Sequence, residues 1–301
     1  MTILQAIILG IVQGLTEFIP VSSTAHLVFA ARLTNLYAGV EQNLRAQQTT
    51  ATIAVVQLGT LAAVIVYFAR DIWNISLSFV RDHWRLLANR RAREAANGPF
   101  VGGLSKETLL GWYIIMGTLP ISIIGLLFKK EIEGTLTKNL WIIATMLIVI
   151  AILLLVAERV GTRRRTMNDL GWRDALIVGC AQVLALIPGA SRSGSTIMGG
   201  LFAGLTREAA ARFSFLLSIP AIFASGLLEL REALAKLPPH SFFALAVATV
   251  VSGLVGYASI WFLLRYLRTH STRLFIGYRL ALGILLLALL TAGVIDPLGT
   301  P

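Results

Sequence analysis

Residues 188–196 read PGASRSGST, and this polar stretch lies between the apolar runs 175–187 and 197–205. Arg192 is therefore placed at membrane depth, where an arginine costs about 2.5–3.5 kcal/mol on insertion scales and usually marks a function. The glycines and hydroxyl side chains around it suit a broken helix whose amides and hydroxyls hold an anion. A second polar island, residues 13–26, reads QGLTEFIPVSSTAH in an equally apolar setting. We predict that the two islands meet and form one site.

The composition is that of a membrane protein. Hydrophobic residues make up 56% of the 301 residues, charged residues make up 14%, and the mean hydropathy is +0.77. We therefore predict an all-α polytopic membrane protein, with residues 1–301 forming a single integral membrane domain. A transmembrane helix needs about 17–25 apolar residues. Six runs satisfy this length: 51–69, 108–128, 140–157, 213–230, 242–264 and 274–295.

Charge and cysteine content exclude other classes of site. The net charge of +11 is attributed to cytoplasmic loops attracted to anionic lipid, so membrane lipids are expected partners and nucleic acid is not. The single cysteine, Cys180, excludes an internal disulfide and a cysteine-based metal site. No cleavable signal peptide is expected, because no basic region precedes the apolar residues 3–11.

The order of elements repeats along the chain. In each half an apolar helix breaks at a proline, Pro20 or Pro188, resumes in a short helix, and is followed by three full spans. Each half-helix is too short to span, so we predict two re-entrant broken-helix pairs. Because three spans is an odd number, the second half enters from the opposite face, which predicts an inverted-topology repeat over about residues 1–157 and 174–296. Gly10 and Gly14 form a GxxxG pair, which indicates close helix packing.

The distribution of Lys and Arg predicts the orientation. Lys and Arg number seven, five, two and three in the loops 70–107, 158–173, 206–212 and 265–273, and two, three and two in the loops 32–48, 129–139 and 231–240. The positive-inside rule places the first group in the cytoplasm and both termini outside. Within the long cytoplasmic loop, residues 82–96 suggest a basic interfacial helix.

The first island offers several candidate catalytic groups. Gln13 and Glu17 lie four residues apart and share a helix face just before the break. An intramembrane glutamate is a functional candidate, although Glu17 would also serve simply by pairing with Arg192 to hold the repeats together. At the following helix start, one hydroxyl is expected to cap the helix and leave the others free. These residues are Ser22, Ser23 and Thr24, with His26 one turn further on, where a buried core histidine is the alternative.

The second island suits an anion. Its turn leads into a helix N-terminus, and Arg192 adds a planar fork that matches phosphate oxygens. Small-residue packing is the alternative role for its serines, and snorkelling is the alternative for Arg192. One carboxylate, one imidazole, several hydroxyls and an arginine together suit phosphoryl transfer. A divalent cation would bridge Glu17 and substrate phosphates. The second-island candidates are Gly189, Ser191, Arg192, Ser193 and Thr196.

These stretches resemble those of the bacterial undecaprenyl-pyrophosphate phosphatases that underlie bacitracin resistance. Residues 13–26 are similar to the family's (E/Q)xxxE segment and its Ser-Ser-Thr-x-His turn, and residues 188–196 are similar to its PGxSRSxxT signature. VQLGT at 56–60 and FSFLLSIP at 213–220 also look typical, so the resemblance covers nearly the whole chain. Two positions depart from the pattern: Gln13, where glutamate is often found, and Ala25, where glycine is usual.

The resemblance implies an activity and a location. It implies hydrolysis of undecaprenyl pyrophosphate to the monophosphate and phosphate, with Mg²⁺ or Ca²⁺, which recycles the lipid carrier for peptidoglycan and confers bacitracin resistance. It places the protein in the bacterial inner membrane and leaves a homodimer open. The count of Lys and Arg in the loops puts the opening of the site on the periplasmic face.

The resemblance also assigns roles. Glu17 would bind metal, helped by Gln13, or act as a base. Ser23 or Ser22 and His26 are the candidate nucleophile and proton-transfer partner, with His26 itself or an activated water as alternatives. The pyrophosphate would be held by Arg192 together with Ser22, Thr24, Gly189, Ser191, Ser193 and Thr196.

Three rival classes are weighed against this reading. A lipid-carrier flippase or secondary transporter fits the inverted repeat, but the Glu-Ser-His-Arg set exceeds what binding alone needs. The membrane phosphatases with an SRx5H motif do not fit, because Met198 stands where the histidine would be. A purely structural scaffold would not place Glu17 and Arg192 in apolar runs.

Overall fold

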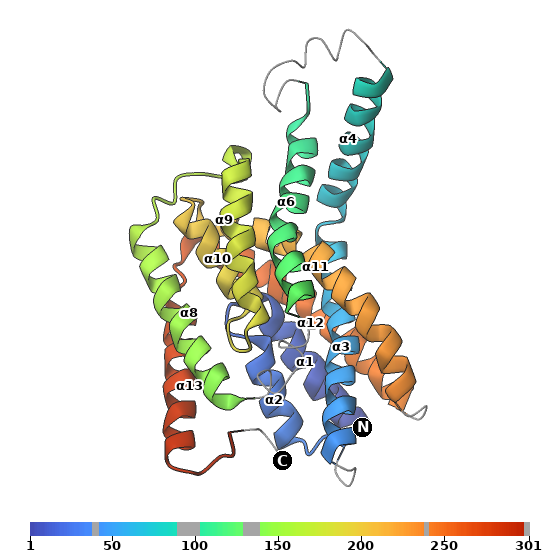
Figure 1. The fold of residues 1–301 in the computed structure, drawn as a ribbon, viewed down its shortest axis with the longest axis vertical. Helices are drawn as coiled ribbons and strands as arrows, with labels where there is room; N and C mark the ends of the chain where they lie inside the picture. The colour runs from blue at the N-terminus through green and yellow to red at the C-terminus, as the bar shows by residue number, and fades with distance from the viewer. Residues whose placement is uncertain (38–41, 89–102, 129–138, 238–240, 298–301) are drawn as a thin grey trace.

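The structure, a computed structural model, describes residues 1–37, 42–88, 103–128, 139–237 and 241–297. Within these ranges the chain forms α-helices, short 3-10 turns and loops without a β-strand, so the prediction of an all-α protein is confirmed (Figure 1). In chain order the elements are α1 (Ile3–Phe18), α2 (Ser23–Leu33), α3 (Gln42–Tyr67), α4 (Ala69–Ala88), α6 (Lys106–Leu127), α8 (Leu140–Val160), η2 (Met167–Asp169), α9 (Trp172–Val183), η3 (Leu184–Leu186), α10 (Arg192–Phe202), α11 (Arg207–Lys236), α12 (Phe242–Thr269) and α13 (Arg273–Thr291).

Among the described residues, five helices are long and apolar enough to cross a membrane. They are α3, α6, α8, α12 and α13, and each coincides with one of the six predicted spans. The sixth predicted span, residues 213–230, lies inside the continuous 30-residue helix α11. The segments predicted to span are therefore all helical.

The start of the predicted loop 70–107 is helical instead. α4 begins at Ala69, directly after α3, and continues to Ala88. Its exposed apolar residues recur at spacings of four and three, namely Trp73, Leu77, Val80, Trp84 and Leu87, and this period is the reason that the segment forms a helix. The predicted interfacial helix 82–96 overlaps the end of α4, and residues 89–96 lie outside the described residues.

Both predicted breaks are present, and they share one backbone feature. α1 ends before Pro20 and α2 begins at Ser23, whereas α9 and η3 end before Pro188 and α10 begins at Arg192. The residue before each second helix is a serine with a positive φ, 78° at Ser22 and 72° at Ser191. Counting from the prolines would set Ser23 opposite Ser191, but the second break is one residue longer, so Ser22 is the equivalent residue.

Helix pairing agrees with the predicted inverted repeat. α9 of the second half packs along α6 of the first half, and the counterpart of this pair is α1 of the first half packed along α12 of the second half. α3 packs on α11, and α8 packs on α13, so each of these pairs joins equivalent helices from the two halves (Figure 1). A two-fold axis that relates the two halves gives this pattern, and contacts between α1 and α10 bring the two broken helices together.

Polar contacts join the four loops that were predicted to share one side. Buried Glu158 pairs with Arg207 and accepts a hydrogen bond from the Thr272 hydroxyl at 2.7 Å. Arg212 pairs with Asp71 at 2.8 Å. These contacts hold the loops 158–173, 206–212 and 265–273 and the beginning of 70–107 at one end of the molecule, as the charge count requires.

Close packing against α12 explains several glycines of the first half. A Cβ at Gly14 would lie 2.8 Å from the Ser252 carbonyl oxygen, and a Cβ at Gly10 would lie 2.6 Å from that of Ala248. The GxxxG pair is therefore a helix contact, as predicted. The tightest approach is at Gly59 of α3, where a Cβ would lie 2.1 Å from the Thr249 carbonyl oxygen.

Gly59→Ala is expected to lower the free energy of unfolding by about 1–3 kcal/mol, because the added methyl group must push α3 away from α12. Thermal unfolding in detergent measures the change. Gly277→Ala is the matched control, since a Cβ at that helical glycine meets no atom within 4 Å. Alanine there should be neutral or stabilising by up to about 1 kcal/mol. Equal unfolding temperatures for the two variants would contradict the packing described for α3 and α12.

Candidate active site

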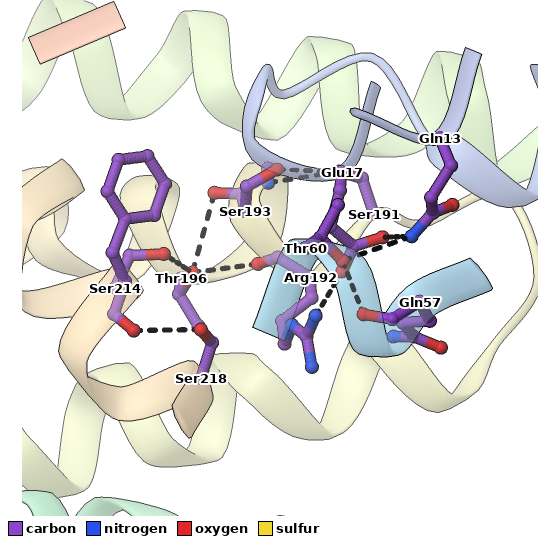
Figure 2. A network of polar contacts seen from close by, with 12 residues as sticks. Gln13, Glu17, Gln57, Thr60, Ser191, Arg192, Ser193, Thr196, Ser214 and Ser218 are labelled. Carbon is purple, nitrogen blue, oxygen red and sulfur yellow. Dashed lines mark hydrogen bonds and ion pairs between the residues drawn. The ribbon is translucent and has the colours of Figure 1, made fainter. Parts of the chain in front are cut away.

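The two islands meet at an ion pair. Arg192 is the first residue of α10, and its guanidinium contacts Oε1 of Glu17 in the last turn of α1 (Figure 2). The Glu17 and Arg192 side chains are only 6% and 16% exposed. Buried charges of this kind persist only when they are paired. The pair also satisfies the alternative in which Glu17 simply holds the repeats together.

Gln13 supports the other oxygen of the carboxylate. Its Nε2 donates to Glu17 Oε2 at 3.0 Å and lies 3.4 Å from the Thr60 hydroxyl of α3. Thr60 in turn donates to the Gln57 carbonyl oxygen at 2.7 Å. The Oε1 atom of Gln13 is buried and has no hydrogen-bond partner within the described part of the chain. An unused buried carbonyl oxygen beside a carboxylate is a ready ligand for a cation.

The oxygen atoms of Glu17 and Gln13 fit the sparse type of Mg²⁺ site. Mg²⁺ is usually bound by one or two protein carboxylates and completes its shell with substrate phosphates and water. No group of three His, Cys, Asp or Glu residues that could hold a metal occurs among the residues that the structure describes. A cation held by Glu17 and Gln13 would therefore depend on substrate phosphates and water for the rest of its shell.

The serines of the second island are joined to one another and to the first break. The Ser191 hydroxyl accepts a hydrogen bond from the Gly194 amide at 3.2 Å and therefore caps α10, and it lies 3.1 Å from the Ser193 hydroxyl. Ser193 donates to the Ile19 carbonyl oxygen at 3.3 Å. These contacts fix the Arg192 turn against the end of α1, and Figure 2 shows Ser191 and Ser193 beside Arg192.

Thr196 lies one turn further and is fully buried. Its hydroxyl donates to the Arg192 carbonyl oxygen at 2.7 Å and contacts the Ser214 hydroxyl of α11 (Figure 2). A cavity of ≈ 10 Å³ adjoins this network, which is room for about one water molecule. The cavity is lined by Glu17, Phe18, Arg192, Ser193, Ser214, Phe215 and Ser218.

His26 forms a second group at the start of α2. Its Nδ1 lies 2.7 Å from the Ser22 carbonyl oxygen, and its Nε2 lies 2.6 Å from the Tyr278 hydroxyl of α13. Ser22 precedes α2, but its hydroxyl makes no capping bond and is buried without a partner in the described chain, so the prediction of a hydroxyl cap is wrong for Ser22. Ser23 is half-buried and Thr24 is exposed.

Arg279 joins the two breaks and was not among the predicted site residues. It lies within α13 and is fully buried. Its guanidinium donates to main-chain carbonyl oxygens of both breaks, at 3.3 Å to Pro20, 2.9 Å to Gly189 and 3.0 Å to Ala190. It also donates to the Leu147 and Met146 carbonyls of α8, each at 3.2 Å. The available signal was an arginine inside the apolar run 274–295.

Gly189 has a backbone reason for being glycine. Its φ is +89°, and a Cβ there would lie 2.4 Å from the Ile143 carbonyl oxygen. Only glycine adopts this conformation without strain and lets the break pass so close to α8. The Gly189 carbonyl oxygen accepts a hydrogen bond from the Arg279 guanidinium.

Comparisons with known proteins identify the family. A family model described as bacitracin resistance protein BacA matches residues 6–285. An undecaprenyl-diphosphatase of Syntrophobacter fumaroxidans is 52% identical over 283 residues, which cover 94% of this chain and 95% of that protein. A protein of the same name from Chlorobium phaeobacteroides is 50% identical, covering 97% and 99%, and one from Nocardia farcinica is 44% identical, covering 98% of each. The chain therefore belongs to the bacitracin resistance protein BacA family.

Proposed function

We propose that this protein hydrolyses undecaprenyl pyrophosphate to undecaprenyl phosphate and inorganic phosphate. The observation that carries the proposal is the buried pair of Glu17 and Arg192, which brings together one residue from each polar island. A guanidinium at membrane depth, at the start of a helix, suits the anionic head group of a lipid. Recycling of the lipid carrier and resistance to bacitracin follow from the same reaction.

The reaction is hydrolysis of the phosphoanhydride bond, and its steps can be assigned to residues of the two islands. A water molecule or a serine hydroxyl, with Ser23 or Ser22 as candidates, attacks the terminal phosphorus. The bond from that phosphorus to the bridging oxygen breaks, and the lipid monophosphate leaves with that oxygen. If a serine attacks, water then releases phosphate from it.

Arg192 and Glu17 would act on charge and protons. Arg192 contacts Glu17 through one terminal nitrogen, which leaves its other N–H groups to face phosphate oxygens. Charge neutralisation and positioning dominate phosphoryl transfer, and this placement supplies both. Glu17 would take the proton of the attacking water or hold a cation.

Mg²⁺ or Ca²⁺ would be held by Glu17 and the free Oε1 of Gln13. When bound, such a cation supplies positive charge that offsets the charge of the two phosphates. Glu17 is the stronger ligand because it is a carboxylate, and Gln13 adds a neutral oxygen at the same helix face.

Gln13→Ala is expected to raise the Mg²⁺ concentration for half-maximal phosphate release by about 10–100-fold. Gln13→Glu should lower that concentration by adding a second carboxylate. Titrations of activity measure both effects, and Mn²⁺ binding followed by electron paramagnetic resonance checks them independently. Gln182→Ala is the matched control, because Gln182 is equally buried in α9 of the second half. The same metal requirement in Gln13→Ala and the wild type would contradict this role.

We also propose that the protein lies in the bacterial inner membrane with its site opening to the periplasmic face. The charge count supports this orientation, since the basic loops share one end of the molecule and the start of α1 lies at the other. A substrate released outside after wall-polymer assembly would then reach the site directly.

Cysteine labelling tests the orientation. In a Cys180→Ser background, Leu33→Cys at the end of α2 should react with a membrane-impermeant maleimide in intact cells. Leu87→Cys in α4 should react only after the cells are permeabilised. Both side chains are well exposed on the protein, at 85% and 69%, so burial within the protein does not separate them. The reverse labelling pattern would overturn the orientation.

Phosphate release by the purified protein tests the proposed function. A polyprenyl pyrophosphate and Mg²⁺ are supplied to protein in detergent, where no membrane separates two compartments. Turnover by the wild type supports hydrolysis and excludes transport as the whole activity. A well-folded wild type that binds the lipid without releasing phosphate would overturn the proposal in favour of a flippase.

A further inference from the structure

The His26 imidazole is held from two sides, and the contacts define its tautomer. The Ser22 carbonyl oxygen, 2.7 Å from Nδ1, can only accept a hydrogen bond, so Nδ1 carries the hydrogen. In the neutral ring, Nε2 is then the basic nitrogen. The atom that meets Nε2 is the Tyr278 hydroxyl at 2.6 Å, which must therefore donate.

The two rings also stack. Their centroids lie 5.6 Å apart and their planes differ by 15°. Stacking and the hydrogen bond together restrict the imidazole to one orientation. Any proton that reaches Nε2 in this arrangement must pass through the Tyr278 hydroxyl, because that hydroxyl occupies the lone pair.

Tyr278 belongs to the junction of the two breaks. The next residue of α13 is Arg279, which binds carbonyl oxygens of both breaks and is the charged group that faces His26 among the described residues. The Ser22 hydroxyl beside His26 is buried and unpartnered in the described chain. Tyr278 is 45% exposed, and its hydrogen bond to His26 lies at the surface of the protein and not in its core.

We propose that Tyr278 and His26 act as one proton-transfer unit in the hydrolysis. As the attacking water or serine hydroxyl loses its proton to the Tyr278 oxygen, Tyr278 gives its own proton to Nε2 of His26. The imidazole becomes the cation, the tyrosine is unchanged, and the proton returns by the same route to the leaving group or to solvent. This inference rests on the proposed function.

Tyr278→Phe removes the hydroxyl and keeps the stacked ring. We expect kcat for phosphate release to fall by about 10²–10⁴-fold with little change in KM, as for loss of a general base. His26→Asn should cause a comparable loss, and the double variant should lose no more than the worse single variant, because residues of one unit are not additive. Tyr257→Phe is the matched control. Tyr257 is also 45% exposed on an apolar helix, and among the described residues its ring packs against Tyr67 and not against a histidine.

Fluorotyrosine at position 278 gives a readout that a structural role would not move. It preserves the ring and the hydroxyl but makes the hydroxyl more acidic, so the pH profile of kcat should shift to lower pH. A Tyr278→Phe protein with wild-type kcat and pH profile would overturn the proposal, as would losses that add in the double variant. Failure of the wild type to release phosphate is a separate outcome and would overturn the proposed function along with this inference.

Discussion

Arg192→Ala is expected to lower phosphate release by about 10³-fold or more, the scale at which an arginine stabilises phosphoryl transfer. The substitution also leaves the Glu17 carboxylate buried without its partner. Breaking one side of a buried ion pair costs about 3–5 kcal/mol, so the protein should also unfold at a lower temperature. Activity and thermal unfolding must therefore be measured on the same preparation.

A paired substitution separates chemistry from scaffolding. Glu17→Met combined with Arg192→Met removes both charges and fills a similar volume, and such replacements are often neutral or stabilising. If the pair serves the reaction, the double variant recovers the unfolding temperature and remains inactive. If the pair only holds the repeats together, stability and phosphate release return together, and the catalytic role is wrong.

Arg192→Lys refines the same experiment. Lysine retains the positive charge beside Glu17 but lacks the planar fork that contacts two phosphate oxygens at once. We expect near-normal stability with a loss of activity. If Arg192→Lys releases phosphate as fast as the wild type, a point charge is sufficient at the start of α10.

Arg279→Met is expected to destabilise the protein by at least about 3 kcal/mol and to lower phosphate release by about 100-fold or more. The substitution leaves several buried carbonyl oxygens without a donor, and each such group costs about 1–3 kcal/mol. The carbonyls that lose their donor belong to Pro20, Gly189 and Ala190 in the two breaks and to Met146 and Leu147 in α8.

Thermal unfolding and hydrogen exchange together locate the damage. Exchange should rise in the amides around both breaks, near residues 19–24 and 187–194, while α12 stays protected. Arg273→Met is the matched control, because Arg273 begins the same helix and is exposed. Damage confined to one break, or equal destabilisation by the two variants, would contradict a role for Arg279 in joining the breaks.

Much of the architecture could be predicted because the physics of the membrane is restrictive. Apolar runs of sufficient length become helices, and the prolines at 20 and 188 end helices where polar residues follow. A carboxylate and a guanidinium in such positions must be buried against each other. The contact between Glu17 and Arg192, 175 residues apart in sequence, follows from this argument.

Other features depend on geometry that a sequence pattern does not carry. Arg279 stands alone in an apolar run, and nothing local indicates that it would reach carbonyls up to 259 residues away. Because the two breaks differ in length by one residue, Ser22 is the structural equivalent of Ser191, whereas alignment on the prolines pairs Ser23 with Ser191. The part of α4 before residue 82 was predicted as a loop because of the basic residues in the segment 70–107, although its apolar residues follow a helical period.

The placement of Arg279 has a consequence for biogenesis. α13 follows every other described helix in chain order, so it is the last of them to leave the ribosome. Until it inserts, the carbonyl oxygens at both breaks lack their shared donor, and the Glu17–Arg192 pair and the Ser193 hydrogen bond to Ile19 are the described contacts that join the breaks. The arrangement of the two breaks would thus be completed only by the last described helix of the chain.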